Sequence, residues 1–173
     1  MELVANMPQL FPLIRGGGAF LALIGLGIVV GSLGSSKWRV VWLIIGFWLG
    51  IAAMAVGGAT KLIFAGLPYP AWWQWVFLGL AFAVEALLVN IVLRRVKDTT
   101  SREFWLWILF IVGVHFLVLG PSHGPICALL ALLCMGNALL GLRLKSVGFR
   151  VFWALDGVLK VGAGTAMVAV SYV

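Results

Sequence analysis

The residues best suited to chemistry are Asp156 and Lys160, which lie in the apolar stretch FWALDGVLKVGAG (152–164). Within a membrane helix an ionisable side chain costs about 2.5–3.5 kcal/mol on insertion scales, and it usually faces the bundle interior. An acid four residues before a base is the favourable order for an ion pair along one helix. The spacing therefore predicts an Asp156–Lys160 pair. Two roles stay open for it: neutralising the charges for insertion, or opening when a substrate competes for one partner.

A second acid, Glu85, lies in another apolar stretch at a similar depth. It precedes Arg94 by nine residues, which is about 13 Å at the rise of an α-helix. Asp156 and Lys160 follow Arg150 by about 9 Å and about 15 Å on the same measure. Two acids and one base leave a formal surplus of one negative charge in this layer. We expect a carboxylate in that position to be protonated or to bind a cation.

Three further polar residues extend the predicted cluster. Asn90 and Asn137 lie nearer the basic ends of their apolar stretches, and His115 lies somewhat deeper. Polar groups within membrane segments usually face the bundle interior. The sequence therefore predicts a shared polar core that binds a small solute or ion, formed by Glu85, Asp156, Lys160, Asn137, His115 and Asn90.

The composition places the chain in the membrane class. Its 173 residues are 64% hydrophobic and 10% charged, with a mean hydropathy of +1.16, whereas soluble domains are about 45–50% apolar and about 25% charged. Segments of about 17–25 apolar residues can cross a bilayer as helices, and these segments lack the alternation of barrel strands. We predict an all-α bundle of six transmembrane helices in a single domain, 1–173, with helices near 16–35, 39–60, 71–93, 104–120, 125–142 and 151–172.

The basic residues predict the orientation of this bundle. The connections after the first, third and fifth segments hold nine of them: Lys37, Arg39, Arg94, Arg95, Lys97, Arg102, Arg143, Lys145 and Arg150. The opposite side holds only Arg15 and Lys61. Basic loops stay in the cytoplasm and face anionic lipid headgroups. We therefore expect an integral protein of the plasma or bacterial inner membrane, with both termini outside the cytoplasm, lipids as neighbours and no nucleic acid partner.

A hairpin repeat is a further prediction. The second, fourth and sixth segments open with RVVW (39–42), REFW (102–105) and RVFW (150–153), which suggests three helical hairpins closed by basic loops. Alternatively, Arg and Trp recur there only because both suit the membrane interface, and a three-helix inverted repeat is the other symmetry that this topology allows. All six prolines are expected outside the helices, with PSHGP (121–125) as an outer loop.

Small residues and cysteines predict packing rather than chemistry. GIVVG (27–31) and GFWLG (46–50) let helices approach closely, either within the chain or in a homo-oligomer or a complex with a membrane protein partner. Cys127 and Cys134 are separated by about 10 Å along a helix, too far for a disulfide. No zinc-ligand spacing involves the two histidines, so we expect neither a metal nor a cofactor.

Three functions are compatible with these features. The leading prediction is binding or transport of a small solute or ion through the polar core, with proton coupling as an option. The second is a non-catalytic subunit or assembly factor that uses its glycine faces to hold a partner. The third is an intramembrane enzyme acting on a lipid, which the absence of HExxH, GxSxG and P-loop motifs makes less favoured.

Overall fold

The computed structural model describes residues 6–55 and 57–173. It is 82% helix, with no strand in the part described. Six helices are long and apolar enough to span a membrane, which confirms the predicted all-α bundle. The helices are α2 (Met7–Leu10), α3 (Ile14–Ser32), α4 (Ser36–Ala55), α5 (Gly57–Phe64), α6 (Trp72–Arg95), α7 (Arg102–His123), α8 (Pro125–Arg143) and α9 (Phe149–Val170).

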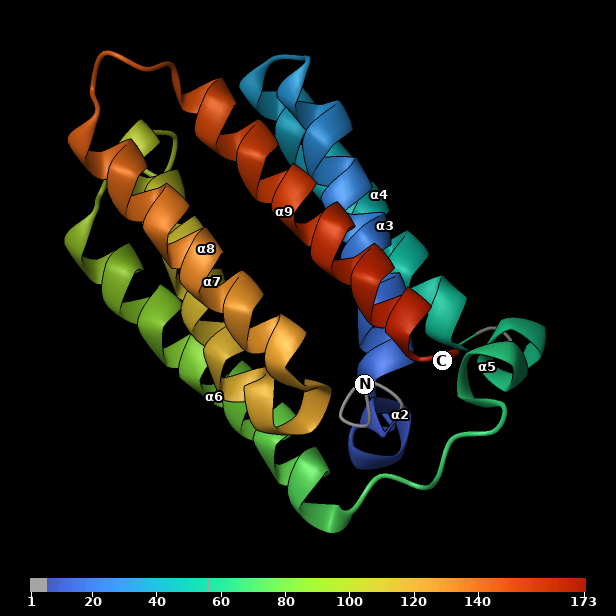
Figure 1. Cartoon of the computed structure of the whole chain (residues 1–173). Coiled ribbons are helices and arrows are strands. Elements are labelled where there is room, and N and C mark those ends of the chain that lie inside the picture. The colour runs from blue at the N-terminus through green and yellow to red at the C-terminus, as the bar shows by residue number, and fades with distance from the viewer. Residues whose placement is uncertain (1–5, 56) are drawn as a thin grey trace.

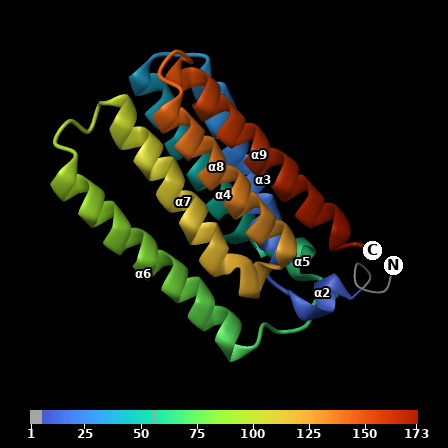
Figure 2. The ribbon, with the colours of Figure 1, turned by 60° about the vertical axis from the view of Figure 1, so that its left-hand side comes forward.

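The six long helices form an open ring. They pack side by side in the order α6, α7, α8, α9, α3, α4, whereas the end helices α4 and α6 do not pack extensively against each other. Within the ring, α3 packs chiefly on α9 and α4, and α7 on α8 and α6. The molecule therefore has two three-helix groups, α3/α4/α9 and α6/α7/α8, which Figure 1 shows on opposite sides of the molecule. Figure 2 shows α6, α7, α8 and α9 side by side.

Glycines bring α3 and α9 into backbone contact. A Cβ atom on Gly164 would lie 2.5 Å from both the Ala22 amide nitrogen and the Gly18 carbonyl oxygen. One on Gly157 would lie 2.9 Å from the Gly25 carbonyl oxygen. Lipid supplies no hydrophobic drive for helix association, so close packing of this kind must stabilise the pair.

Glycines also join α3 to α4, and they come from the two predicted motifs. A Cβ atom on Gly46, from GFWLG, would lie 2.9 Å from the Leu23 carbonyl oxygen and 3.2 Å from the Gly27 Cα atom. Gly27, from GIVVG, would in turn collide with the Trp42 carbonyl oxygen. Both motifs therefore serve packing within the chain.

The second predicted segment, 39–60, corresponds to α4 and the first residues of α5, which the structure describes on the two sides of residue 56. Figure 1 shows the described part of α5 turned aside from the axis of α4.

The PSHGP segment was predicted wrongly as a loop, and the prolines wrongly as lying outside helices. Pro121 lies inside α7, which continues to His123, while Pro8 lies within α2 and Pro125 begins α8. Only Gly124 separates α7 from α8, and its φ of +93° suits glycine. A proline is tolerated in the first turn of a helix, where its missing N–H has no helical partner.

A buried arginine closes the bundle at the end that holds the termini. The Arg15 guanidinium donates to the Ser171 hydroxyl at 2.9 Å and carbonyl at 2.7 Å, and to the Ala65 carbonyl at 2.9 Å. It also lies 3.9 Å from the centre of the Tyr172 ring. Arg15 thus links α3 to the carboxyl ends of α5 and α9, where a cation is favoured by the helix dipole.

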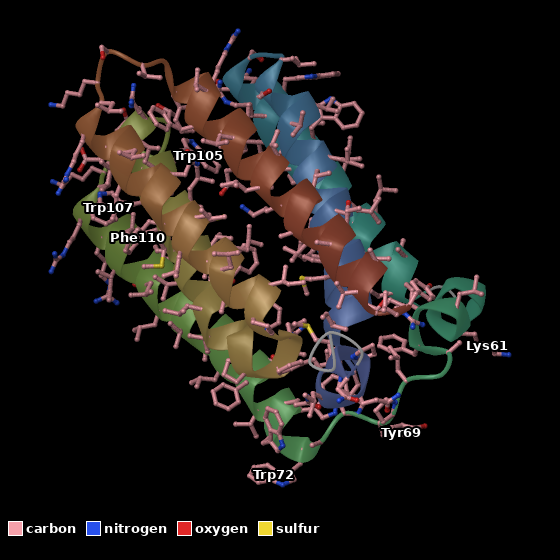
Figure 3. The ribbon with its side chains drawn as sticks, in the orientation of Figure 1. Lys61, Tyr69, Trp72, Trp105, Trp107 and Phe110 are labelled. Atoms are coloured by element: carbon pink, nitrogen blue, oxygen red, sulfur yellow. The ribbon has the colours of Figure 1, made fainter. Side chains whose placement is uncertain are left out.

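The opposite end carries the basic connections. Arg102 donates to the carbonyls of Gly141 at 2.7 Å and Val147 at 2.6 Å, so it caps the end of α8. In the α6–α7 turn, hydrogen bonds from the Thr100 hydroxyl and amide lower the pKa of Asp98. Figure 3 shows Lys61, Tyr69 and Trp72 at the end that holds both termini. Which end faces the cytoplasm stays a prediction.

Cysteine labelling tests that orientation. The two native cysteines are buried. A single cysteine introduced at Tyr69 or at Lys145, both exposed, is therefore expected to be the only one that reacts with the label. A membrane-impermeant maleimide applied to intact cells should label Tyr69→Cys and spare Lys145→Cys until the membrane is permeabilised. The reverse pattern would place the termini in the cytoplasm.

The α3–α9 contact predicts a sharp contrast between two neighbouring glycines. Gly164→Ala should lower the free energy of unfolding by about 1–3 kcal/mol, because its methyl group meets backbone atoms that cannot yield. Gly162→Ala, on the same helix, has open space and serves as the matched control. Thermal melts in one detergent should show a lower Tm for Gly164→Ala alone. Equal Tm values would contradict the close contact.

Candidate functional site

A cavity of about 420 Å³ lies inside the open ring. All six spanning helices contribute to its wall, which is mostly apolar and includes four phenylalanines, Phe20, Phe47, Phe82 and Phe116. Besides the Cys127 thiol of α8, the described part of the wall holds four acidic or basic side chains: Glu85 from α6, His115 and His123 from α7, and Lys160 from α9. Three of the six residues predicted from the sequence therefore meet at one cavity.

Glu85 and His115 form a contact between α6 and α7. The Glu85 Oε2 and His115 Nδ1 atoms lie 2.9 Å apart, with the Glu85 side chain 30% exposed and the His115 side chain 9% exposed. The atoms are close enough for an ion pair, but their angle is not that of a hydrogen bond. The His115 ring also meets the Phe82 ring edge to face at 5.1 Å. The contact places an acid and a base from neighbouring helices beside each other.

Asp156 and Lys160 form the predicted pair along α9. The Lys160 ammonium donates to Asp156 Oδ2, and the side chains are 2% and 0% exposed, respectively. The second oxygen, Asp156 Oδ1, has no hydrogen-bond partner among the described residues, although the Cys134 thiol lies beside this carboxyl group. Since buried charges are stable only when paired, the two residues compensate each other.

Lys160 connects this pair to the cavity. Its Nζ atom lies 5.5 Å from the centre of the Phe116 ring, and its side chain lines the same cavity as Glu85. Asp156 and Lys160 together carry no net charge. The remaining pair carries one negative charge when His115 is neutral and none when one proton is added to it.

The two predicted asparagines lie elsewhere. Asn137 is buried and donates from Nδ2 to the Phe152 carbonyl at 2.8 Å, so it joins α8 to α9 four residues before Asp156. Asn90 is exposed and accepts a hydrogen bond from Arg94 Nε at 2.8 Å. Neither residue lines the cavity. Asn137 supports the helix that carries the ion pair, and Asn90 stabilises the last turn of α6.

His123 is a cavity residue that the sequence interpretation assigned to a loop. It is 7% exposed, and its Nδ1 atom lies 2.8 Å from the Ser122 hydroxyl. Its ring lies against Gly17 of α3, where a Cβ atom would collide with it. The sequence signal for its position is Pro125, because proline is favoured at the first residue of a helix. If α8 begins at Pro125, α7 can extend as far as His123.

A second groove lies between α6 and α7 near the basic end. It measures about 380 Å³ and is lined by residues that include Arg95, Glu103, Trp107 and Phe110. Figure 3 labels Trp107 and Phe110 in this part of the molecule. None of the six predicted site residues lines this groove.

The described residues contain no group of three His, Cys, Asp or Glu side chains that could hold a metal ion. Cys127 lines the cavity and Cys134 lies beside Asp156, and both are free thiols.

Six spanning helices define a polytopic integral membrane protein. The chain belongs to a family of unknown function, DUF6609, whose model matches residues 6–172. No curated protein and no solved structure matches the chain.

The buried ion pair predicts a test by single and double substitution. Asp156→Leu alone and Lys160→Met alone each leave an uncompensated buried charge, and each should reduce stability by about 3–5 kcal/mol. The double variant replaces both charges by apolar groups of similar size and should recover most of that loss. Thermal melts of the four proteins in one detergent measure the coupling. Additive losses would contradict the pairing.

Proposed function

We propose that this chain binds a small solute in the cavity and carries it across the membrane, with a proton exchanging at the Glu85–His115 pair. The observation that carries the proposal is the meeting of Glu85, His115 and Lys160, from three helices, at one cavity of about 420 Å³. Ionisable side chains inside membrane bundles commonly mark solute pathways and proton relays. Ligand cavities are typically about 300–1,000 Å³.

The division into two helix groups supports movement of the solute. The groups α3/α4/α9 and α6/α7/α8 meet mainly where α8 packs on α9, with few further contacts between α3 and α7. The cavity lies between them, since Phe20, Phe47 and Lys160 belong to one group and Phe82, Glu85 and His115 to the other. Transporters commonly expose a fixed central site to each side in turn by rocking one bundle against another.

The subunit role has lost the feature that suggested it. The glycines of GIVVG and GFWLG face each other between α3 and α4, so they are not a free surface for another protein. The enzyme role lacks an activated nucleophile, because the acids and the lysine at the cavity are paired with each other or with His115. Solute binding is the role for which the observed cavity is suited.

Filling the cavity tests the proposal. Leu78 lines the cavity on α6, whereas Leu80, two residues further along, is 47% exposed and does not. Leu78→Trp should remove a bound small molecule, because the larger ring occupies the cavity, and Leu80→Trp should retain it. Native mass spectrometry after gentle extraction measures the bound mass, and the same spectra report whether the chain is a homo-oligomer.

The outcome that would contradict the proposal is specific. An empty wild-type chain associated with a second protein in fixed ratio would favour the subunit role. A bound molecule retained equally by both tryptophan variants would place it outside this cavity.

A further inference from the structure

Resting on that proposed function, we infer that the solute is a lipophilic organic cation that enters the cavity from the membrane and displaces one proton from the Glu85–His115 pair. The inference stands on three features of the cavity: the balance of its charges, its aromatic wall, and the side on which the ring is open. Each restricts the chemical class of the solute independently.

The charges leave room for one monovalent cation. The titratable groups that face the cavity are Glu85 of α6, His115 and His123 of α7, Cys127 of α8 and Lys160 of α9, whereas α3 and α4 contribute none to its wall. Lys160 is neutralised by Asp156. Among the described residues, Glu85 is then the one acid that lines the cavity without a lysine or arginine partner. Its negative charge is balanced by a proton shared with His115 or by the charge of a bound solute.

The wall suits an organic cation. Phe82 and Phe116 flank His115, with ring centres 5.1 Å and 5.7 Å from it. Phe20 and Phe47 pack edge to face at 5.6 Å on the facing helices. Aromatic faces attract cations, more strongly where water is excluded, and they bind the apolar substituents of the same molecule. A cation bound beside Glu85 would therefore meet rings from both helix groups.

Divalent inorganic cations and organic anions fit the cavity less well. Calcium takes six to eight oxygen ligands and magnesium needs near-octahedral geometry, but among the described residues of the wall only Glu85 offers a carboxylate. An anion would have to compete with Asp156 for Lys160, whose side chain is 2% exposed, and would face the charge of Glu85. A bulky cation that holds its water weakly avoids both costs.

The open side of the ring indicates the route. The end helices α4 and α6 supply Phe47 and Ile51 on one side and Leu78, Phe82 and Glu85 on the other, without packing extensively on each other. Phe47 and Phe82, on the two sides of this seam, are 39% and 57% exposed. Both belong to spanning helices, so this is the side on which the cavity would meet the hydrocarbon core. Apolar molecules concentrate in that core, so a lipophilic cation can reach Glu85 without first passing through water.

A pair of probes of nearly equal shape and opposite charge tests the inference. Tetraphenylphosphonium and tetraphenylborate are titrated by equilibrium dialysis into the full chain in phosphatidylcholine nanodiscs, with empty nanodiscs subtracted. The phosphonium should bind the chain and the borate should not. Glu85→Gln should weaken phosphonium binding at least about tenfold, because it removes the charge that faces the cation. Glu103→Gln, the same change at an exposed acid outside the cavity, should leave it unchanged.

Proton exchange gives a second readout. The proton and the cation compensate the same negative charge and therefore compete. Phosphonium affinity should fall as the pH is lowered, by at most about tenfold per pH unit for one proton. In a weakly buffered solution, the number of protons released for each cation bound should equal the slope of log affinity against pH, up to one, and Glu85→Gln should release none.

Failure of this inference is distinguishable from failure of the proposed function. Borate binding that equals or exceeds phosphonium binding, or phosphonium binding unaffected by Glu85→Gln, would overturn the cationic assignment. So would a neutral or anionic molecule that is bound to the extracted wild type and lost in Leu78→Trp, although solute binding in the cavity would then stand. If neither probe binds and the extracted chain is empty, both proposals fall together.

Discussion

The backbone contact between α3 and α9 is the constraint on which the rest of the site depends. Gly157 and Gly164 face α3, where no side chain larger than hydrogen fits without moving backbone atoms. Asp156 and Lys160 lie on the adjoining stripe of α9, so the same contact decides which way the ion pair points. With α9 held against α3, Lys160 is directed at the cavity and Asp156 at Cys134 of α8. With larger residues at these two positions, α9 would have to pack farther from α3.

The low dielectric of a membrane explains why the other polar side chains are arranged as they are. Unpaired polar groups in hydrocarbon are costly. Arg15 and Arg102 accordingly lie at opposite ends of the bundle and donate to carbonyls at helix ends. Asn137 donates to a backbone carbonyl of the neighbouring helix. Glu85 and His115 differ from these residues, because they meet each other at a cavity. For that reason they are candidates for a binding site, whereas the other polar residues stabilise the fold.

Local features of the site were predictable, and distant ones were not. The Asp156–Lys160 pair follows from a spacing of four residues on one helix, so it needs no knowledge of the tertiary fold. Glu85 and His115 are thirty residues apart in the sequence, and only the packing of α6 on α7 brings them together. Asn90 and Asn137 looked equivalent as polar residues in apolar stretches, yet one faces outward and one joins two helices. The rotation of each helix about its axis decides that difference.

By itself the sequence determined the class, the number of spanning helices, their approximate limits and the clustering of basic residues at one end, because hydrocarbon thickness and backbone hydrogen bonding leave few alternatives. Only the tertiary structure decided that the ring is open between α4 and α6, that α7 runs on to a buried His123, and that the glycine motifs serve α3 and α4 within one chain. These features depend on contacts between segments far apart in the sequence, and the apolar composition of every segment makes several packings equally compatible with hydropathy alone.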